Sequence, residues 1–257
     1  MQRLVFWLGY PLLWIISKLP FPIFYKVSDV VFLFVFYIFR YRRKTVRENL
    51  RLVFPEKPEA ELKRIEKLSM KHTVDMFLEM IKSISISEKE LKKRFKLKNV
   101  EVLREIEALN KSILLACGHY ASYEGMTALQ LYGIAYKGFG VYKKVKNPYF
   151  DKLARDIRGR YDGVLIPSTE ATKTITRNEK KGIKGVYAMI ADQSPKLSNA
   201  KNWTNFMGIM APIFVGTEVL SRRLEMAVVY LQVEKIKRGH YEATFKTISI
   251  DPRNEKE

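Results

Sequence analysis

Hydrophobic and polar positions follow two patterns along the chain, and the change comes at about residue 112. Before it, apolar residues recur at helical spacing, which predicts helices over 45–85 and 101–109. After it, short apolar runs of strand length alternate with helical patterns. The runs lie at 112–117, 137–142, 164–166, 185–191, 227–233 and 242–248, and the helical patterns include 125–131, 148–160 and 216–223.

This alternation predicts the fold class. Wholly apolar runs of four to eight residues are typical of strands buried on both faces, and strands that alternate with helices favour a parallel sheet. We therefore expect an α/β domain over 41–257, with a largely parallel sheet flanked by helices, preceded by a separate membrane-associated segment over 1–40.

The first 40 residues carry two apolar runs, at 4–16 and 30–39. A membrane-spanning helix needs about 20 apolar residues, which neither run reaches by itself. The first run either spans, if it extends to about Phe24, or lies in the interface with Trp7 and Trp14 as anchors. A basic cluster follows the second run and indicates the cytoplasmic side; its members are Arg40, Arg42, Arg43, Lys44 and Arg47. The alternative is that both runs are core helices.

Composition narrows the class of partner. The 257 residues are 47% hydrophobic and carry a net charge of +19, so a sizeable core and an anionic partner are both expected. Such a partner is a membrane surface, an acidic protein, a phosphorylated substrate or nucleic acid. Nucleic acid is disfavoured, because the aromatic residues gather in apolar runs rather than among basic residues. A non-catalytic basic membrane-binding protein is a further alternative.

Cysteine and histidine usage predicts neither a disulfide nor a bound cofactor. Cys117 is the single cysteine, which fits a reducing compartment, and its place in an apolar run indicates a small core residue. The three histidines are widely separated, and no spacing resembles a zinc site. No phosphate-binding loop or dinucleotide-binding motif is present.

Candidate chemistry lies where two apolar runs end. His119 follows the run at 112–117, and Glu124 comes five residues later, so the pair resembles a general base and the carboxylate that orients it. Asp192 follows the run at 185–191 and, in a parallel sheet, shares its carboxyl edge with His119. The plainer alternatives are a hydrogen-bonded loop histidine for His119 and a turn or N-cap residue for Asp192.

Taken together, the ordered motifs resemble the bacterial lipid A biosynthesis acyltransferases, the late lauroyl/myristoyl acyltransferase family. The resemblance covers nearly the whole chain. It rests on 44–55 (KTVRENLRLVFP), Gly118-His119 with Glu124, Lys146-Asn147-Pro148 followed by Arg158 and Arg160, Ala191-Asp192-Gln193, Trp203 to Phe206, and 212–218 (PIFVGTE).

The resemblance implies a glycerolipid-acyltransferase fold and acyl transfer from a thioester, usually on acyl carrier protein, to a hydroxyl of a lipid A precursor. By similarity, His119 is the base and Glu124 its partner, and either Arg158 or Arg160 matches the active-site arginine. Asp192 matches a polar site position. The expected location is the bacterial inner membrane, with the catalytic domain on its cytoplasmic face. An acyltransferase of the same fold that acts on a phospholipid or aminolipid is the alternative.

One departure from the family concerns the C-terminus. Members usually continue past the last strand into a helical region rich in Trp, Arg and His, whereas this chain stops at 251–257 (DPRNEKE). We expect a naturally short member or a truncated one.

Overall fold

The computed structural model describes residues 1–255, and the chain divides into two compact units. The first, called the α/β unit below, comprises Met1–Leu8, Ser87–Asn202 and Pro212–Glu257. The second, called the helical unit, comprises Gly9–Ile86 and Trp203–Ala211. The helices between residues 43 and 82 belong to the helical unit.

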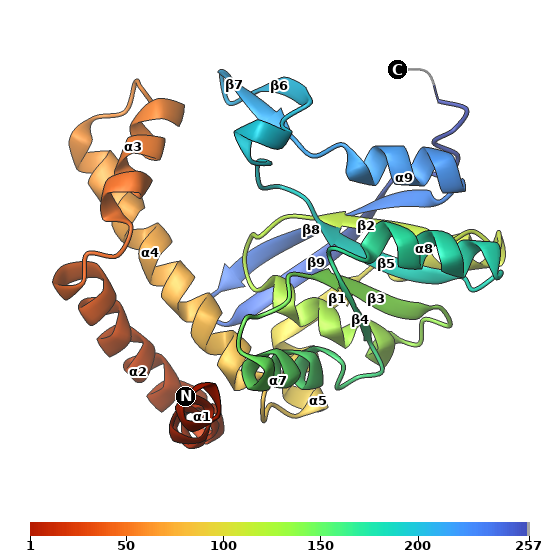
Figure 1. The fold of residues 1–257 in the computed structure, drawn as a ribbon. Helices are drawn as coiled ribbons and strands as arrows, with labels where there is room; N and C mark the ends of the chain where they lie inside the picture. Colours follow the sequence, from red (N-terminus) through yellow and green to blue (C-terminus); the bar gives the residue numbers. More distant parts are fainter. Residues whose placement is uncertain (256–257) are drawn as a thin grey trace. The chain divides into compact units, whose positions relative to one another are not determined.

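Helices form the helical unit almost entirely (Figure 1). They are α1 (Gln2–Lys18), α2 (Phe21–Leu33), the π-helical turn η1 (Phe34–Ile38), α3 (Arg43–Val53) and α4 (Glu59–Lys82). The first turns of α1 belong to the α/β unit. Pro20 and Pro58 hold the extended backbone, with ψ of 144° and 148°, from which α2 and α4 start. Proline restricts the backbone at these positions, so both helices begin at sharply defined points.

The core of the helical unit lies between α2 and α4. Its buried side chains are Phe24, Phe32, Phe36, Met70, Val74 and Leu78. Lys82, only 7% exposed, reaches from the end of α4 to the end of α1. Its ammonium donates hydrogen bonds to the carbonyl oxygens of Ser17 (2.6 Å) and Leu19 (2.5 Å). These bonds satisfy carbonyl groups that a helix C-terminus leaves without partners.

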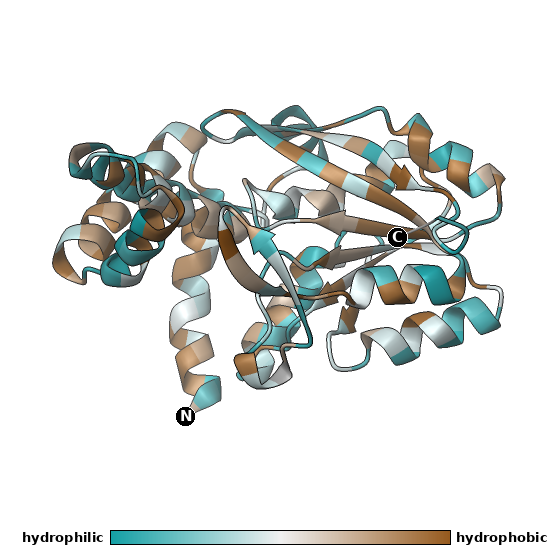
Figure 2. Cartoon of the chain, turned by 90° about the horizontal axis from the view of Figure 1, so that it is seen from above, coloured by the Kyte–Doolittle hydropathy of each residue, from teal (hydrophilic) through white to brown (hydrophobic). Residues whose placement is uncertain are grey.

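The second apolar run is longer in the structure than its sequence pattern suggested. Helix α2 begins at Phe21, before the predicted run, because Phe21–Phe24 are also apolar. At its other end it continues without interruption into η1. Among the described residues, the 18-residue stretch Phe21–Ile38 is the one helix long and apolar enough to cross a membrane by length and composition. Helix α1, which starts at the label N in Figure 2, is also hydrophobic over most of its turns.

A seven-stranded sheet forms the centre of the α/β unit. Its strands are β1 (Phe95–Lys98), β2 (Ile113–Cys117), β3 (Lys137–Tyr142), β4 (Val164–Pro167), β5 (Gly185–Ile190), β8 (Ala227–Lys237) and β9 (His240–Ser249). They lie in the order β1-β9-β8-β2-β5-β3-β4. Neighbours are parallel except for the antiparallel pair β8–β9, which confirms the predicted largely parallel sheet.

Helices cover both faces of this sheet (Figure 1). On one face, α8 (Ala171–Lys180) and α9 (Gly216–Leu224) pack on a core that includes Leu114, Phe139 and Tyr187. On the other lie α5 (Glu88–Arg94), α6 (Glu101–Ala108), α7 (Pro148–Arg158) and the 3₁₀ helix η2 (Tyr123–Tyr132). A second short 3₁₀ helix, η3, spans Leu197–Asn199.

Every apolar run predicted to be a strand is one, with ends that move by a few residues. The sequence pattern did not predict β1 or the hairpin of β6 (Asn202–Phe206) and β7 (Ile209–Ile213). The hairpin turn consists of Met207 and Gly208, both with positive φ (53° and 81°), as in tight two-residue hairpin loops. Strand β1 alternates apolar and basic residues, and β6 is exposed along its length, so neither forms a continuous apolar run. Strand β7 is apolar throughout but contains Pro212, which is unusual within a strand.

Candidate active site

His119 and Asp192 follow two neighbouring strands at the same edge of the sheet. Strands β2 and β5 pair in parallel, with Cys117 opposite Ile190, so the residues just beyond these positions meet. Gly118 makes the close approach possible, because a Cβ at this position would lie 3.2 Å from Asp192 Oδ2. The connections leaving β2 and β5 lead in opposite directions along the sheet, the arrangement at which α/β proteins form ligand sites.

Two hydrogen bonds join these residues. His119 Nδ1 lies 2.6 Å from Asp192 Oδ1, and the backbone N–H of His119 donates to Asp192 Oδ2 at 2.8 Å. A carboxylate only accepts hydrogen bonds, so the ring proton is assigned to Nδ1 and Nε2 keeps its lone pair. Burial alone would raise the pKa of Asp192, but the hydrogen bonds from His119 outweigh it and hold that pKa below its ordinary value. The His119 side chain is 35% exposed, so a substrate can reach it.

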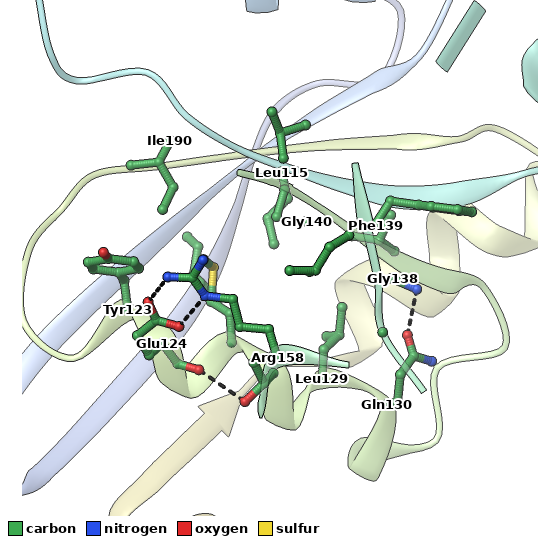
Figure 3. A pocket seen from close by; sticks show the side chains of 18 of the residues that line it. Leu115, Tyr123, Glu124, Leu129, Gln130, Gly138, Phe139, Gly140, Arg158 and Ile190 are labelled. Carbon is green, nitrogen blue, oxygen red and sulfur yellow. Dashed lines mark hydrogen bonds and ion pairs between the residues drawn. The ribbon is translucent and has the colours of Figure 1, made fainter. Parts of the chain in front are cut away.

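Glu124 and Arg158 form a second charged pair (Figure 3). Glu124 stands in the first turn of η2, and Arg158 is the last residue of α7. The Arg158 Nε–H donates to Glu124 Oε2 at 2.8 Å, and its Nη2 donates to Oε1, so the pair is bidentate. Glu124 is 8% exposed and Arg158 24%. The hydrogen bond to Glu124 raises the pKa of Arg158 further, despite the opposing effect of burial.

The structure changes the expected partner of His119. The carboxylate that contacts the ring is Asp192, whereas Glu124, expected in that place, binds Arg158. The reason is geometric: the strand register sets Asp192 beside His119, while η2 turns Glu124 toward the end of α7. Of the two candidate arginines, Arg158 is the one paired with Glu124. Arg160 instead places its guanidinium 5.5 Å from the centre of the Tyr161 ring.

Tyr123 connects the two pairs, and nothing in the sequence singled it out. Its ring meets the His119 ring edge-on, with 5.2 Å between the centroids, and it lines the same cavity as Glu124 and Arg158. Burial and the nearby Glu124 carboxylate raise the pKa of Tyr123. The phenol therefore stays protonated and keeps a hydrogen available for donation next to both pairs.

An apolar cavity opens beside the Glu124–Arg158 pair, between the sheet and η2 (Figure 3). Strands β2, β3, β4 and β5 line one side of it through Leu115, Gly138, Gly140, Leu165, Val186, Ala188 and Ile190. Helix η2 supplies Met126, Thr127, Leu129 and Gln130 on another side. Gly140 and Ala188 stay partly exposed although they lie in interior strands, because short side chains leave the space open.

Cys117 lies at the end of β2 but is not equipped as a nucleophile. Burial, with a smaller contribution from the Asp192 carboxylate, raises the pKa of Cys117 to about 12. The thiolate is the reactive form of cysteine, so this thiol is inert near neutral pH. Among residues 1–255, no group of three or more His, Cys, Asp and Glu side chains is placed to hold a metal ion.

Comparisons with known proteins all identify the same family. A family model described as bacterial lipid A biosynthesis acyltransferase matches residues 1–252. The chain is 26% identical over 192 residues to the lipid A biosynthesis lauroyltransferase of Escherichia coli (strain K12), which covers 75% of this chain and 62% of that protein.

Two further relatives are more distant. Lipid A biosynthesis acyltransferase 2 of Shigella flexneri is 25% identical over 61% of this chain and 49% of its own length. The lipid A biosynthesis myristoyltransferase of Escherichia coli (strain K12) is 24% identical, over 61% of this chain and 48% of that protein. The chain thus spans between about half and 62% of the length of these relatives.

Proposed function

The chain belongs to the bacterial lipid A biosynthesis acyltransferase family, and we propose that it moves an acyl chain from a thioester donor to a hydroxyl of a lipid A precursor. The observation that carries this proposal is the His119–Asp192 pair at the carboxyl edge of the sheet, joined through Tyr123 to an apolar cavity. Family membership likewise supports a glycerolipid-acyltransferase fold for the α/β unit.

The reaction needs a base, because a hydroxyl is a poor nucleophile. Nε2 of His119 takes the proton as the acceptor oxygen attacks the thioester carbonyl carbon. Asp192 holds the proton on Nδ1 and stabilises the imidazolium that forms. When the tetrahedral intermediate collapses, the C–S bond breaks, and the imidazolium returns the proton to the leaving thiolate. The new bond is an ester, and His119 regains its starting state.

The tetrahedral intermediate carries a negative oxygen that requires hydrogen-bond donors. Arg158 uses two of its five N–H groups on Glu124, so three remain for this oxygen. Glu124 accordingly acts as a positioning residue: its bidentate contact fixes the guanidinium plane at the rim of the cavity. The sequence analysis gave Glu124 the role of orienting His119; the geometry favours Asp192 for that role.

The apolar cavity receives the acyl chain in this proposal. It begins at Tyr123, Glu124 and Arg158 and continues along the sheet between apolar side chains. A hydrocarbon chain gains free energy by leaving water for such a surface, at about 25 cal/mol per Å² buried. Binding there holds the thioester carbonyl near Arg158 and His119.

The partners follow from charge and family membership. A net charge of +19 favours an anionic donor such as acyl carrier protein, a phosphorylated glycolipid acceptor and an anionic membrane surface. We place the protein at the bacterial inner membrane, with the α/β unit on the cytoplasmic face. The N-terminal segment makes the attachment, because α1 exposes large apolar side chains; those of Leu4, Trp7, Leu8 and Leu12 are each at least 59% exposed.

The test is acyl transfer from acyl carrier protein to a tetra-acylated lipid A precursor that carries its inner sugars, followed by mass spectrometry of the lipid. We expect the wild type to add the mass of one acyl group and His119→Ala to add none. His240→Ala is the matched control and should keep the activity, because His240 lies at the start of β9 and contacts the carbonyl oxygen of Arg238.

No product with folded wild-type protein and a verified donor would contradict the lipid A assignment. Phospholipid and aminolipid acceptors would then decide whether another acceptor serves the same chemistry. Equal products from the wild type and His119→Ala would contradict the role of His119.

A further inference from the structure

Gln130 lines the apolar cavity on the side away from Glu124 and Arg158, next to Gly138 (Figure 3). Its Oε1 accepts a hydrogen bond of 2.6 Å from the Gly138 N–H at the start of β3. Its Nε2 donates to the carbonyl oxygens of Tyr136 (3.2 Å) and Ile134 (3.4 Å). The amide thus binds backbone groups at both of its ends.

The cavity runs along the strands from the charged rim to this amide. Register places Gly138 beside Val186 near the amino-terminal edge, and Gly140 beside Ala188 in the middle. Tyr142, at the end of β3, lies at the level of the rim. Tyr142 lies four positions after Gly138 along β3, a rise of about 13 Å along the strand. Along β3, the lining of the cavity thus extends from the charged rim to Gln130.

We propose that Gln130 is the floor that sets the length of acyl chain the protein accepts, and that Gly140 and Ala188 keep the passage to it open. This inference rests on the proposed function, because it assigns the acyl chain to this cavity. A chain that ends at Gln130 fills the cavity, a shorter one leaves apolar surface uncovered, and a longer one meets the amide.

Gln130 resists displacement because three hydrogen bonds hold its amide in place. An acyl chain that pushed Gln130 aside would leave the Gly138 N–H and a carbonyl oxygen without partners in an apolar setting, which is costly. The position is also closely packed: a Cβ at Gly138 would lie 2.9 Å from Gln130 Oε1. The middle of the passage has little spare room either, because a Cβ at Gly140 would lie 3.2 Å from Leu165 Cδ2.

Three substitutions with effects in two opposite directions test the inference. Gln130→Ala removes the floor and should shift the preferred chain to a longer one. Gly140→Ala narrows the passage and should shift it to a shorter one, and Ala188→Leu should do the same from the neighbouring strand. Each shift should amount to at least roughly a tenfold change in relative kcat/KM between donors that differ by two carbons, since even one methylene in an apolar pocket has about this effect.

Three further variants show whether a shift in chain preference comes from the shape of the cavity or from a general loss of folding. Gln130→Met keeps the length of the side chain but loses its hydrogen bonds, so its preference should shift less than that of Gln130→Ala. Gly216→Ala repeats the glycine substitution where a Cβ would meet nothing within 4 Å. Gln232→Ala removes a glutamine that binds Glu234 and does not line the cavity. The last two should leave the preference unchanged.

Chain preference is read in two ways. One is acyl transfer from a series of saturated donors, and the other is displacement of a fluorescent fatty acid by unlabelled saturated fatty acids, which needs no turnover. Unchanged preferences in Gln130→Ala, Gly140→Ala and Ala188→Leu, with transfer intact, would overturn the inference and leave the proposed function standing. Shifted binding preferences without any transfer by the wild type would support the floor and contradict the proposed function.

Discussion

At the scale of single residues, the site depends on which carboxylate each charged group meets. Two oxygens of Asp192 bind the ring and the backbone of His119, so this one side chain fixes the position and the tautomer of the base. Glu124 does the same for Arg158 through two parallel hydrogen bonds. The site therefore contains two preorganised pairs, to which the proposed mechanism gives separate tasks, one for the proton and one for the oxyanion.

Asp192→Asn tests the division of tasks. An asparagine Nδ2–H donates to Nδ1 and favours the tautomer with its proton on Nε2, which cannot accept the substrate proton. We expect kcat to fall by about two to four orders of magnitude while the binding of fatty acid to the cavity stays unchanged. Steady-state kinetics and the displacement assay measure these two quantities.

Glu124→Gln is the comparison for that variant. It leaves the His119–Asp192 contact intact and loosens Arg158, so the pH dependence of kcat should keep the wild-type shape at a lower level. A kcat for Asp192→Asn close to the wild-type value would instead return the orienting role to Glu124.

At the scale of elements, buried charges on α4 hold the N-terminal helices in place. Glu66, with its side chain 1% exposed, binds Arg43 Nε at 2.7 Å and Arg47 Nη2 at 2.7 Å, which joins α3 to α4. Lys82 joins the end of α4 to the end of α1. Removing one partner from a buried ion pair leaves an uncompensated charge, which costs about 3 kcal/mol or more.

Glu66 predicts a pH dependence of stability. Burial alone would raise the pKa of Glu66, but the hydrogen bonds from Arg43 and Arg47 hold it below its ordinary value. A lowered folded-state pKa means that the pair stabilises the fold above the ordinary glutamate pKa of about 4.3, and that this contribution is lost as the pH falls through the lowered value.

Glu66→Gln should therefore be less stable than the wild type by about 1 to 3 kcal/mol at neutral pH, because the Arg43 and Arg47 side chains that lose their acceptor are partly exposed (26% and 30%). The difference should shrink in acid. Urea unfolding followed by circular dichroism at several pH values measures it. Glu48→Gln is the control, because the Glu48 pair with Lys44 is exposed and 3.9 Å long, and should change stability by less than about 1 kcal/mol. A difference that does not depend on pH would contradict the assignment.

At the scale of the whole molecule, the proposed membrane attachment raises the question of whether the Phe21–Ile38 stretch spans the membrane or lies on its surface. The Phe21–Ile38 stretch is long enough to span a membrane. However, α2 faces α4 through three polar contacts, which are spaced about one turn apart along α4. They join Tyr25 to Glu79 (2.8 Å), Ser28 to Asp75 (2.6 Å) and Asp29 to Lys71 (2.9 Å). A spanning α2 would carry these charged groups into hydrocarbon, which is expensive, so we infer that the segment lies in the interface.

Cysteine labelling distinguishes the two placements. Lys18→Cys and Lys44→Cys mark exposed positions on either side of the stretch, and Cys117 contributes no background because it is buried and its pKa is raised to about 12. In sealed vesicles with the cytoplasmic face outward, an impermeant maleimide should label both variants. Labelling of only one variant, with both labelled after permeabilisation, would show that the segment spans.

Local sequence determined the strands and the edge of the sheet that carries the chemistry. Residues such as Ile113–Cys117 are apolar at every position, which is typical of a strand buried on both faces, and such strands are most often parallel. Parallel strands share a carboxyl edge, so His119 and Asp192 had to lie at the same edge. The family resemblance rests on the same motifs, and the family model confirms it.

Tertiary structure alone decided which of these residues touch. His119 has a carboxylate five positions along the chain and another 73 positions away, and it binds the distant one. Spacing along the chain does not report strand register or the direction in which η2 turns Glu124. The same holds for Gln130, whose role as a floor depends on a hydrogen bond to Gly138 on a separate element. Backbone patterns are set by neighbouring residues, whereas side-chain partners are set by packing between distant segments.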